Sequence, residues 1–431
     1  MNARAEDGWI LGRGVRGLLR CDGAEVVEGI ARYVMSQHGS LRVGSKLMES
    51  ARGTPLPALT ALLGGLTRFL EVRAGACRED AVWVARLSNE RRALETLPEL
   101  LPELEWTEWK LKRPPDASAL RGLAGLRLSS VRRAYRLARR LHGRYEFFKV
   151  LRVIELVGYY ARYLQLFRGG RFRLAVMSSH SNPHGIAFNL AARRCGVPVV
   201  LVTHGMPVRP VAPLKYEMAV VHCVAARQTY EEEGCRVGRV LVHGRREHHA
   251  PMPRGPLPSR LRVGVFLCKD VNEGRLCELV ENLLADPRVS SVILRPHPKN
   301  LCRGLEEWVE SLGEPRLSLS RSGSVFEDVA ASDVVLAGNS SVLAEALTAG
   351  RPAAYVRGID HGSYDLHAFV ARGLVYEYED GRGLDLEAMR RFYLRADWPD
   401  ALQLFANVRE DAESVTSRTR DELRVLVSTG P

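Results

Sequence analysis

From Arg173 to Val356 the chain alternates short apolar runs with helical segments, and this alternation constrains the fold more than any other feature. The expected strands cover 174–179, 197–203, 218–222, 239–244, 261–267, 289–295, 316–320, 333–338 and 352–356. Strands separated by helices predict parallel sheets that are covered by helices on both faces. The expected fold class is therefore α/β, with two Rossmann-like doubly wound domains that face a cleft.

A proline-rich stretch, residues 248–260, divides the strands into two groups and cannot form a helix or a central strand. We expect it to link two domains. The N-terminal domain covers residues 1–247, and its Rossmann-like part covers residues 173–247. The C-terminal domain covers residues 261–400, and a helical tail covers residues 401–431.

The first 170 residues are expected to be mainly helices and loops, with one strand at 81–87. The net charge of +12 comes from this part of the chain, because residues 110–173 hold 17 Lys and Arg residues against three acidic residues. Residues 130–168 have helical apolar spacing with arginines between the apolar positions. They form either core-facing helices with a solvated basic face or a surface that rests on anionic lipid. No nucleic-acid motif accompanies the charge, so no nucleic acid is expected as a partner.

Eight cysteines are scattered without a CxxC pair, which argues against a zinc site or a disulfide framework. The sequence also lacks a signal-peptide pattern, and it has no 18-residue run that is both apolar and free of charge. We expect a cytoplasmic protein that lies peripherally on the inner face of the cell membrane.

Polar clusters directly follow four of the expected strands. His180 and His184 lie in "SSHSNPHG", and His204 and Gly205 follow the strand at 197–203. The other two clusters belong to the second domain: Arg295, His297 and Lys299 in "RPHPKN", and Asn339, Ser340 and Ser341 in "GNSS". Ligands of parallel sheets bind outside the carboxyl ends of the strands, so these clusters are candidate site residues.

Two of these clusters have the chemistry of an anion site. Ser340 and Ser341 precede a helix, where free amides, hydroxyls and the helix dipole favour a phosphate, and a plain N-cap is the alternative. Glu345 is placed to reach a ribose hydroxyl or to cap the helix. Arg295, His297 and Lys299 occupy alternate positions of an extended Pro-rich loop, which suits a nucleotide phosphate.

These motifs resemble a known family. The "RPHP" and "SS…EALTAGRP" segments resemble the nucleotide-binding half of two-domain glycosyltransferases of the GT-B fold. The resemblance is strongest to the bacterial capsule and wall polymer group, which includes polysialyltransferase-like, Kdo-transferase-like and CDP-glycerol glycerophosphotransferase-like enzymes. In that group an HP motif and a serine pair hold a cytidine nucleotide. "HGMPVRP" is similar to the "HGTPLK" of the glycerophosphotransferases, whose histidine is the proposed base, whereas "AGNSS" replaces their "TDYSS".

The resemblance implies a glycosyltransferase that moves a sugar or polyol phosphate from a nucleotide-activated donor, CMP- or CDP-type rather than UDP, onto a surface-polysaccharide or lipid-linked acceptor. His204 is the expected base, with His180 and His184 as competitors, and His361 is expected to touch the donor. No cofactor and no metal are expected, since no Asp-x-Asp motif occurs. The alternatives are a sugar-nucleotide epimerase and a non-catalytic scaffold in polysaccharide export.

Overall fold

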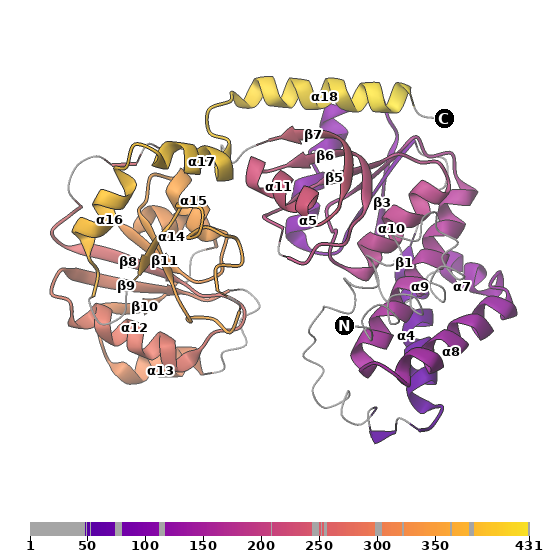
Figure 1. The fold of residues 1–431 in the computed structure, drawn as a ribbon, viewed down its shortest axis with the longest axis horizontal. Coiled ribbons are helices and arrows are strands. Elements are labelled where there is room, and N and C mark those ends of the chain that lie inside the picture. Colours follow the sequence, from indigo (N-terminus) through magenta and orange to yellow (C-terminus); the bar gives the residue numbers. More distant parts are fainter. Residues whose placement is uncertain are drawn as a thin grey trace.

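The structure is a computed structural model that describes residues 48, 50–51, 53–73, 80–111, 117–207, 209–243, 250, 252–253, 257–297, 304–320, 323–362, 364–378 and 383–429. Two separate β-sheets, each with its own helices, dominate the fold (Figure 1). Within the described residues, no helix has the length and apolar character needed to cross a membrane.

The N-terminal sheet has seven strands in the order β1-β3-β2-β4-β5-β6-β7. All neighbours are parallel except the β1–β3 pair, which is antiparallel. The central strands are short apolar runs that are completely buried, as expected for a parallel sheet covered on both faces. The strands are β1 (Val72–Arg73), β2 (Ala81–Ala85), β3 (Trp106–Leu111), β4 (Leu174–Met177), β5 (Val199–Val202), β6 (Lys215–Val221) and β7 (Arg236–Val242).

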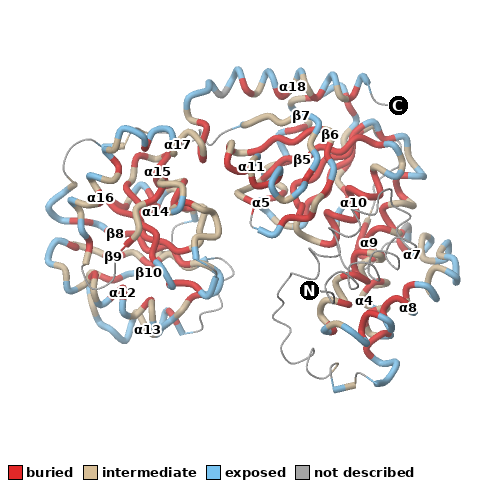
Figure 2. Tube along the Cα trace, viewed as in Figure 1, coloured by how far each residue is buried: buried red, intermediate tan, exposed pale blue. Residues whose placement is uncertain are grey.

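The strands of this sheet are mostly buried (Figure 2). Residues of α9 and α10 belong to one hydrophobic cluster, which continues into the C-terminal domain, and residues of α5, α6 and the last helix of the chain belong to a second cluster. The helices of this part are α4 (Leu56–Glu71), α5 (Ser88–Leu94), α6 (Leu97–Leu100), α7 (Ala117–Ala124), α8 (Leu128–His142), α9 (Phe147–Gly169), α10 (Pro183–Arg194) and α11 (Val224–Glu232).

The N-terminal sheet begins earlier in the chain than the sequence indicated. Residues 1–170 were expected to contain a single strand at 81–87, yet β1 and β3 also lie there and pair with each other. The strand β3 reads "WTEWKL". Its charged residues made it look like an exposed segment, although Thr107 and Trp109 are buried. The helical region before residue 173 is therefore part of the first α/β domain rather than a separate helical unit.

The C-terminal sheet has six strands, all parallel, in the order β10-β9-β8-β11-β12-β13. Together the two sheets confirm the expected α/β class with two doubly wound domains. The strands are β8 (Leu261–Phe266), β9 (Val289–Arg295), β10 (Leu317–Leu319), β11 (Val334–Ala337), β12 (Ala353–Val356) and β13 (Tyr376–Tyr378). The helices are α12 (Glu273–Ala285), α13 (Leu305–Leu312), α14 (Val325–Ala331), α15 (Val342–Thr348), α16 (Leu386–Tyr393) and α17 (Trp398–Ala406).

The last helix, α18 (Ala412–Ser428), leaves the C-terminal domain and lies across the N-terminal one (Figure 1). Leu423 and Val427 belong to the same buried cluster as Leu94 and Leu97 of the N-terminal domain. Arg424 Nε also donates to Glu103 Oε1 over 2.9 Å. The chain therefore crosses between the domains twice, first after β7 and again before α18.

Candidate active site at the carboxyl edges of the two sheets

His204 and Ser178 meet at the carboxyl edge of the N-terminal sheet. Ser178 directly follows β4, His204 follows β5 by two residues, and these two strands are neighbours. The Ser178 hydroxyl and His204 Nδ1 are 2.8 Å apart. If Nδ1 carries the proton and donates it to the hydroxyl oxygen, Nε2 is left as an acceptor. The pair therefore orients one ring nitrogen of His204 for proton transfer.

Opposing effects act on the pKa of His204. Burial lowers the pKa of His204, while the carboxylate of Glu90 and a hydrogen bond to the Ser178 backbone act to raise it. The net pKa is lowered, so the ring is neutral at neutral pH and able to accept a proton.

Glu90 is a residue that the sequence analysis missed. Its side chain is fully buried in the first turn of α5, directly after β2. Its Oε2 accepts the backbone amides of Arg86 (2.7 Å) and Leu87 (3.2 Å). Its Oε1 has no hydrogen-bond partner among the described residues. The sequence signal for Glu90 was its position soon after an expected strand. Its proximity to His204 becomes visible only in the structure, where β2 pairs with β4.

His180 and His184 lie inside the protein instead of at an open edge. His180 Nδ1 is 2.9 Å from the hydroxyl of Tyr230, and burial, with a smaller effect of His204, lowers its pKa to about 3. Both ring nitrogens of His184 are buried without a partner, and the ring packs against Tyr159. Burial, then Arg86 and Arg152, lowers the pKa of His184 to about 3. Both rings are buried, whereas His204 is only partly buried.

Gly205 follows His204, but the backbone there does not demand a glycine. Its φ is not positive, and a Cβ built on it would meet no atom within 4 Å. A sharp turn that excludes a side chain is therefore not the reason for this glycine. The open space beside it leaves the surroundings of His204 uncrowded.

At the carboxyl edge of the C-terminal sheet, Asp360 organises the turn after β11. It accepts the backbone amide of Asn339 at 2.8 Å and the Asn339 side-chain amide at 2.9 Å. Asn339 Oδ1 in turn accepts the amide of Leu366 at 2.8 Å. A Cβ on Gly338 would lie 2.1 Å from Asp360 Oδ2, so this position requires glycine. Asn339 therefore holds the turn in shape.

The serine pair sits in this turn, partly exposed. Ser341 Oγ donates to Glu345 Oε1 over 3.0 Å, and Ser340 Oγ accepts the Val342 amide over 3.4 Å. Both hydroxyls thus have hydrogen bonds within the turn. A phosphate that binds here would have to replace some of these hydrogen bonds. The exposed Lys269 follows β8, which pairs with β11 in the register that sets Phe266 opposite Ala337, so it lies at the same carboxyl edge of the sheet as the serines. Lys269 is a cation that the sequence analysis did not single out.

Arg295 does not present a free charge at this edge. Its guanidinium forms a short ion pair with Asp328 and also donates to the Ser324 carbonyl over 3.0 Å. Both side chains are largely buried, so the charge of Arg295 is compensated inside the domain. His297 is exposed at the end of β9, and His361 is exposed with its amide bonded to the Asp270 carbonyl at 3.2 Å. Lys299 lies outside the described residues.

Metal ligands are not gathered at these edges. Across the part of the chain that the structure describes, no group of three or more His, Cys, Asp or Glu side chains is arranged to hold a metal ion.

No protein-family model matches the sequence, and no curated protein shows significant similarity to it. Solved structures of similar fold include CalG4, the calicheamicin glycosyltransferase, with 13% identity, 82% of this chain and 99% of that chain covered, and a TM-score of 0.48. The glycosyltransferase SnogD from Streptomyces nogalater has 15% identity, covers 82% and 100% of the two chains, and has a TM-score of 0.43. UDP-GlcNAc 2-epimerase from Neisseria meningitidis, bound to UDP-GlcNAc, has 9% identity, 82% and 100% coverage, and a TM-score of 0.44. The likeness concerns the fold alone.

Proposed function

We propose that this protein transfers a sugar or polyol phosphate from a nucleotide-activated donor to a hydroxyl group of an acceptor. The observation that carries the proposal is the Ser178–His204 pair, which holds a neutral imidazole at the carboxyl edge of a parallel sheet. Transferases and an epimerase occur among the similar structures, so the fold by itself does not choose the reaction.

The proposed chemistry starts at His204. Its Nε2 takes the proton of the acceptor hydroxyl as the acceptor oxygen bonds to the electrophilic atom of the donor, the anomeric carbon or the phosphorus. The bond from that atom to the nucleotide phosphate oxygen breaks, and the nucleotide leaves with the electron pair. The Ser178 hydroxyl keeps Nδ1 protonated throughout, and the nearby Glu90 carboxylate stabilises the imidazolium that forms.

The C-terminal domain supplies the proposed donor site. The nucleotide phosphate would lie at the turn after β11, where Ser340 and Ser341 exchange contacts within the turn for contacts with phosphate oxygens. Lys269, with no ion pair among the described residues, supplies the compensating charge that Arg295 cannot. His297 and His361, which follow β9 and β12, are exposed and complete the proposed donor surface. The resemblance of the "RPHP" and "SS" motifs supports a cytidine nucleotide as the donor.

The acceptor is proposed to be a surface polysaccharide or a lipid-linked glycan, with the enzyme on the inner face of the cell membrane. The observation that supports a membrane location is the basic segment at 110–173.

The donor is tested by thermal-shift titration of the full chain with CMP, CDP, UDP and GDP. We expect a cytidine nucleotide to raise the melting temperature, and Lys269→Ala and Ser341→Ala to reduce that rise. Stabilisation by UDP alone would refute the cytidine donor and favour an epimerase. If no nucleotide stabilises the protein, the transferase proposal fails.

The base is tested by the release of nucleotide from the donor that binds. His204→Ala is expected to lower this release by about 10²-fold or more without weakening nucleotide binding. Ser178→Ala should lower it less, and Ser179→Ala is the matched control, since that hydroxyl bonds to Asn182 and not to His204. Unchanged release in His204→Ala would refute His204 as the base, whereas no release by the parent chain would favour a scaffold.

A further inference from the structure

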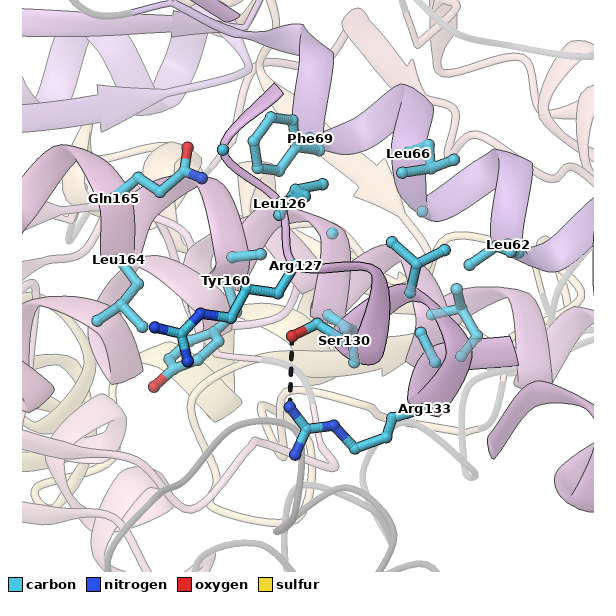
Figure 3. Close-up of a pocket in the computed structure, with 18 of the residues that line it drawn as sticks. Leu62, Leu66, Phe69, Leu126, Arg127, Ser130, Arg133, Tyr160, Leu164 and Gln165 are labelled. Atoms are coloured by element: carbon cyan, nitrogen blue, oxygen red, sulfur yellow. Dashed lines mark hydrogen bonds between the residues drawn. The ribbon is translucent and has the colours of Figure 1, made fainter. Parts of the chain in front are cut away.

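A pocket of about 330 Å³ lies among the helices of the N-terminal domain, away from the strand ends described above (Figure 3). Its walls come from α4, α8, α9 and the residues just before α8. They carry both apolar and polar groups, and the apolar side chains include Leu62, Leu66, Phe69, Ile154, Val157 and Leu164. The helices α4 and α9 approach closely beneath it, because a Cβ on Gly158 would lie 1.9 Å from the Gly65 carbonyl oxygen. The pocket thus has a rigid apolar floor.

Arginines line one side of this pocket. Figure 3 shows Arg127 and Arg133 across from the α4 leucines, and Arg133 donates to Ser130 over 3.4 Å. Arg168 and Arg194 also contribute to the lining. Neither Arg127 nor Arg133 forms an ion pair with any residue that the structure describes. The pocket therefore combines apolar side chains with arginines that have no ion-pair partner among the described residues.

The surface around the pocket has the same combination. The helix α8 exposes five arginines and contains no acidic residue. Five leucines of the pocket-forming region are 45% to 63% exposed, although leucines of this kind are usually buried: Leu56, Leu59, Leu63, Leu120 and Leu128. Exposed apolar side chains next to cations are typical of surfaces that enter the membrane interface.

We propose that this pocket binds the hydrocarbon chain of a membrane lipid with an anionic head group. The chain would occupy the pocket that α4, α8 and α9 line, and Arg127 and Arg133 would pair with the head group. A nucleic acid would use the arginines but would leave the apolar pocket and the exposed leucines without a role. The proposal does not depend on the transfer reaction, because binding needs no donor nucleotide.

The proposal predicts a dependence of affinity on chain length. Binding of octyl, decyl and dodecyl phosphate to the full chain, measured by calorimetry below micelle formation, should strengthen about fourfold for each added methylene until the pocket is full. Inorganic phosphate should bind far more weakly than any of the three. Equal binding of inorganic phosphate and dodecyl phosphate would overturn the proposal, since it would show an anion site that ignores the chain.

Variants separate the pocket from general charge attraction. Ala161→Phe fills the pocket and should abolish the chain-length dependence. Arg133→Glu should weaken dodecyl phosphate binding at least tenfold, whereas Arg139→Glu, on the same helix but outside the lining, should change it less than twofold. Equal losses in the two arginine variants would refute the assigned head-group contact.

Vesicles identify the source of the lipid. The parent chain should co-sediment with phosphatidylcholine vesicles that contain phosphatidylglycerol, but not with phosphatidylcholine alone, and Ala161→Phe should reduce this binding. Binding of single-stranded DNA in preference to these vesicles would overturn the proposal. So would chain-length dependence that survives unchanged in Ala161→Phe.

Discussion

Replacing His184 by leucine should make the stability of the protein less sensitive to acid. The ring of His184 is buried, neither nitrogen has a partner, and burial lowers its pKa to about 3. An exposed histidine in the unfolded chain has a pKa of about 6.5. As the pH falls below 6.5 the unfolded chain therefore binds a proton that the folded chain does not, so stability is lost between pH 6.5 and pH 3.

The size of the effect follows from these two pKa values. The uncharged native ring costs about 0.2 kcal/mol of unfolding free energy at pH 7 and about 2 kcal/mol at pH 5. Leucine has a similar volume and does not titrate. Between pH 7 and pH 5, His184→Leu should therefore lose about 2 kcal/mol less stability than the parent chain.

Urea unfolding of the full chain at several pH values measures this difference. Trp109 is buried in the same domain as His184, so its fluorescence reports the relevant transition. His361→Leu is the control, because that side chain is exposed and its replacement should leave the pH dependence unchanged. Identical pH slopes for the parent and His184→Leu would show that the ring binds its proton equally in the folded and the unfolded chain, and the reasoning would be refuted.

Three further predictions concern the two strand edges. Glu90→Gln should move the acid limb of nucleotide release to lower pH, because it removes a charge that raises the pKa of His204, and a pH–rate profile that stays in place would contradict this. Gly338→Ala should lower the melting temperature and abolish nucleotide binding, while Gly205→Ala, with open space at its Cβ, should change stability by about 0.5 kcal/mol or less in thermal unfolding. Arg295→Met should destabilise the protein by about 3 kcal/mol in urea unfolding, because it leaves the Asp328 carboxylate buried without a partner. If the variant instead kept full stability and lost nucleotide binding, Arg295 would be a donor-binding residue.

The parallel organisation was predictable because it depends on local patterns. Runs such as "VVLV" and "VVLA" are buried on both faces, and such runs are continuous in sequence. Proximity of His204 to the end of β4 also followed, since consecutive parallel strands end on the same edge. The strand β3 was missed because its alternating charges resemble an exposed segment.

The side-chain partners were not predictable, because they depend on contacts between distant segments. The sequence suggested that Arg295 is a free cation, but in the structure Asp328 of α14 forms an ion pair with it. His184 lies in a histidine-rich loop sequence, but the first turn of α10 directs it toward Tyr159. Glu90 is near His204 only because β2 inserts between β3 and β4 in the sheet. Each of these outcomes is set by packing and not by composition.

The return of α18 to the first domain has a consequence for how the protein is made. Leu423 and Val427 complete the cluster that contains Leu94, Leu97 and Leu101. During synthesis the part of this apolar face that α18 covers stays exposed until the whole second domain has emerged from the ribosome. Domains of nascent chains usually fold in order, and exposed apolar surface promotes aggregation in the interval. Until α18 or a chaperone covers this face, the first domain should therefore be prone to associate with other chains.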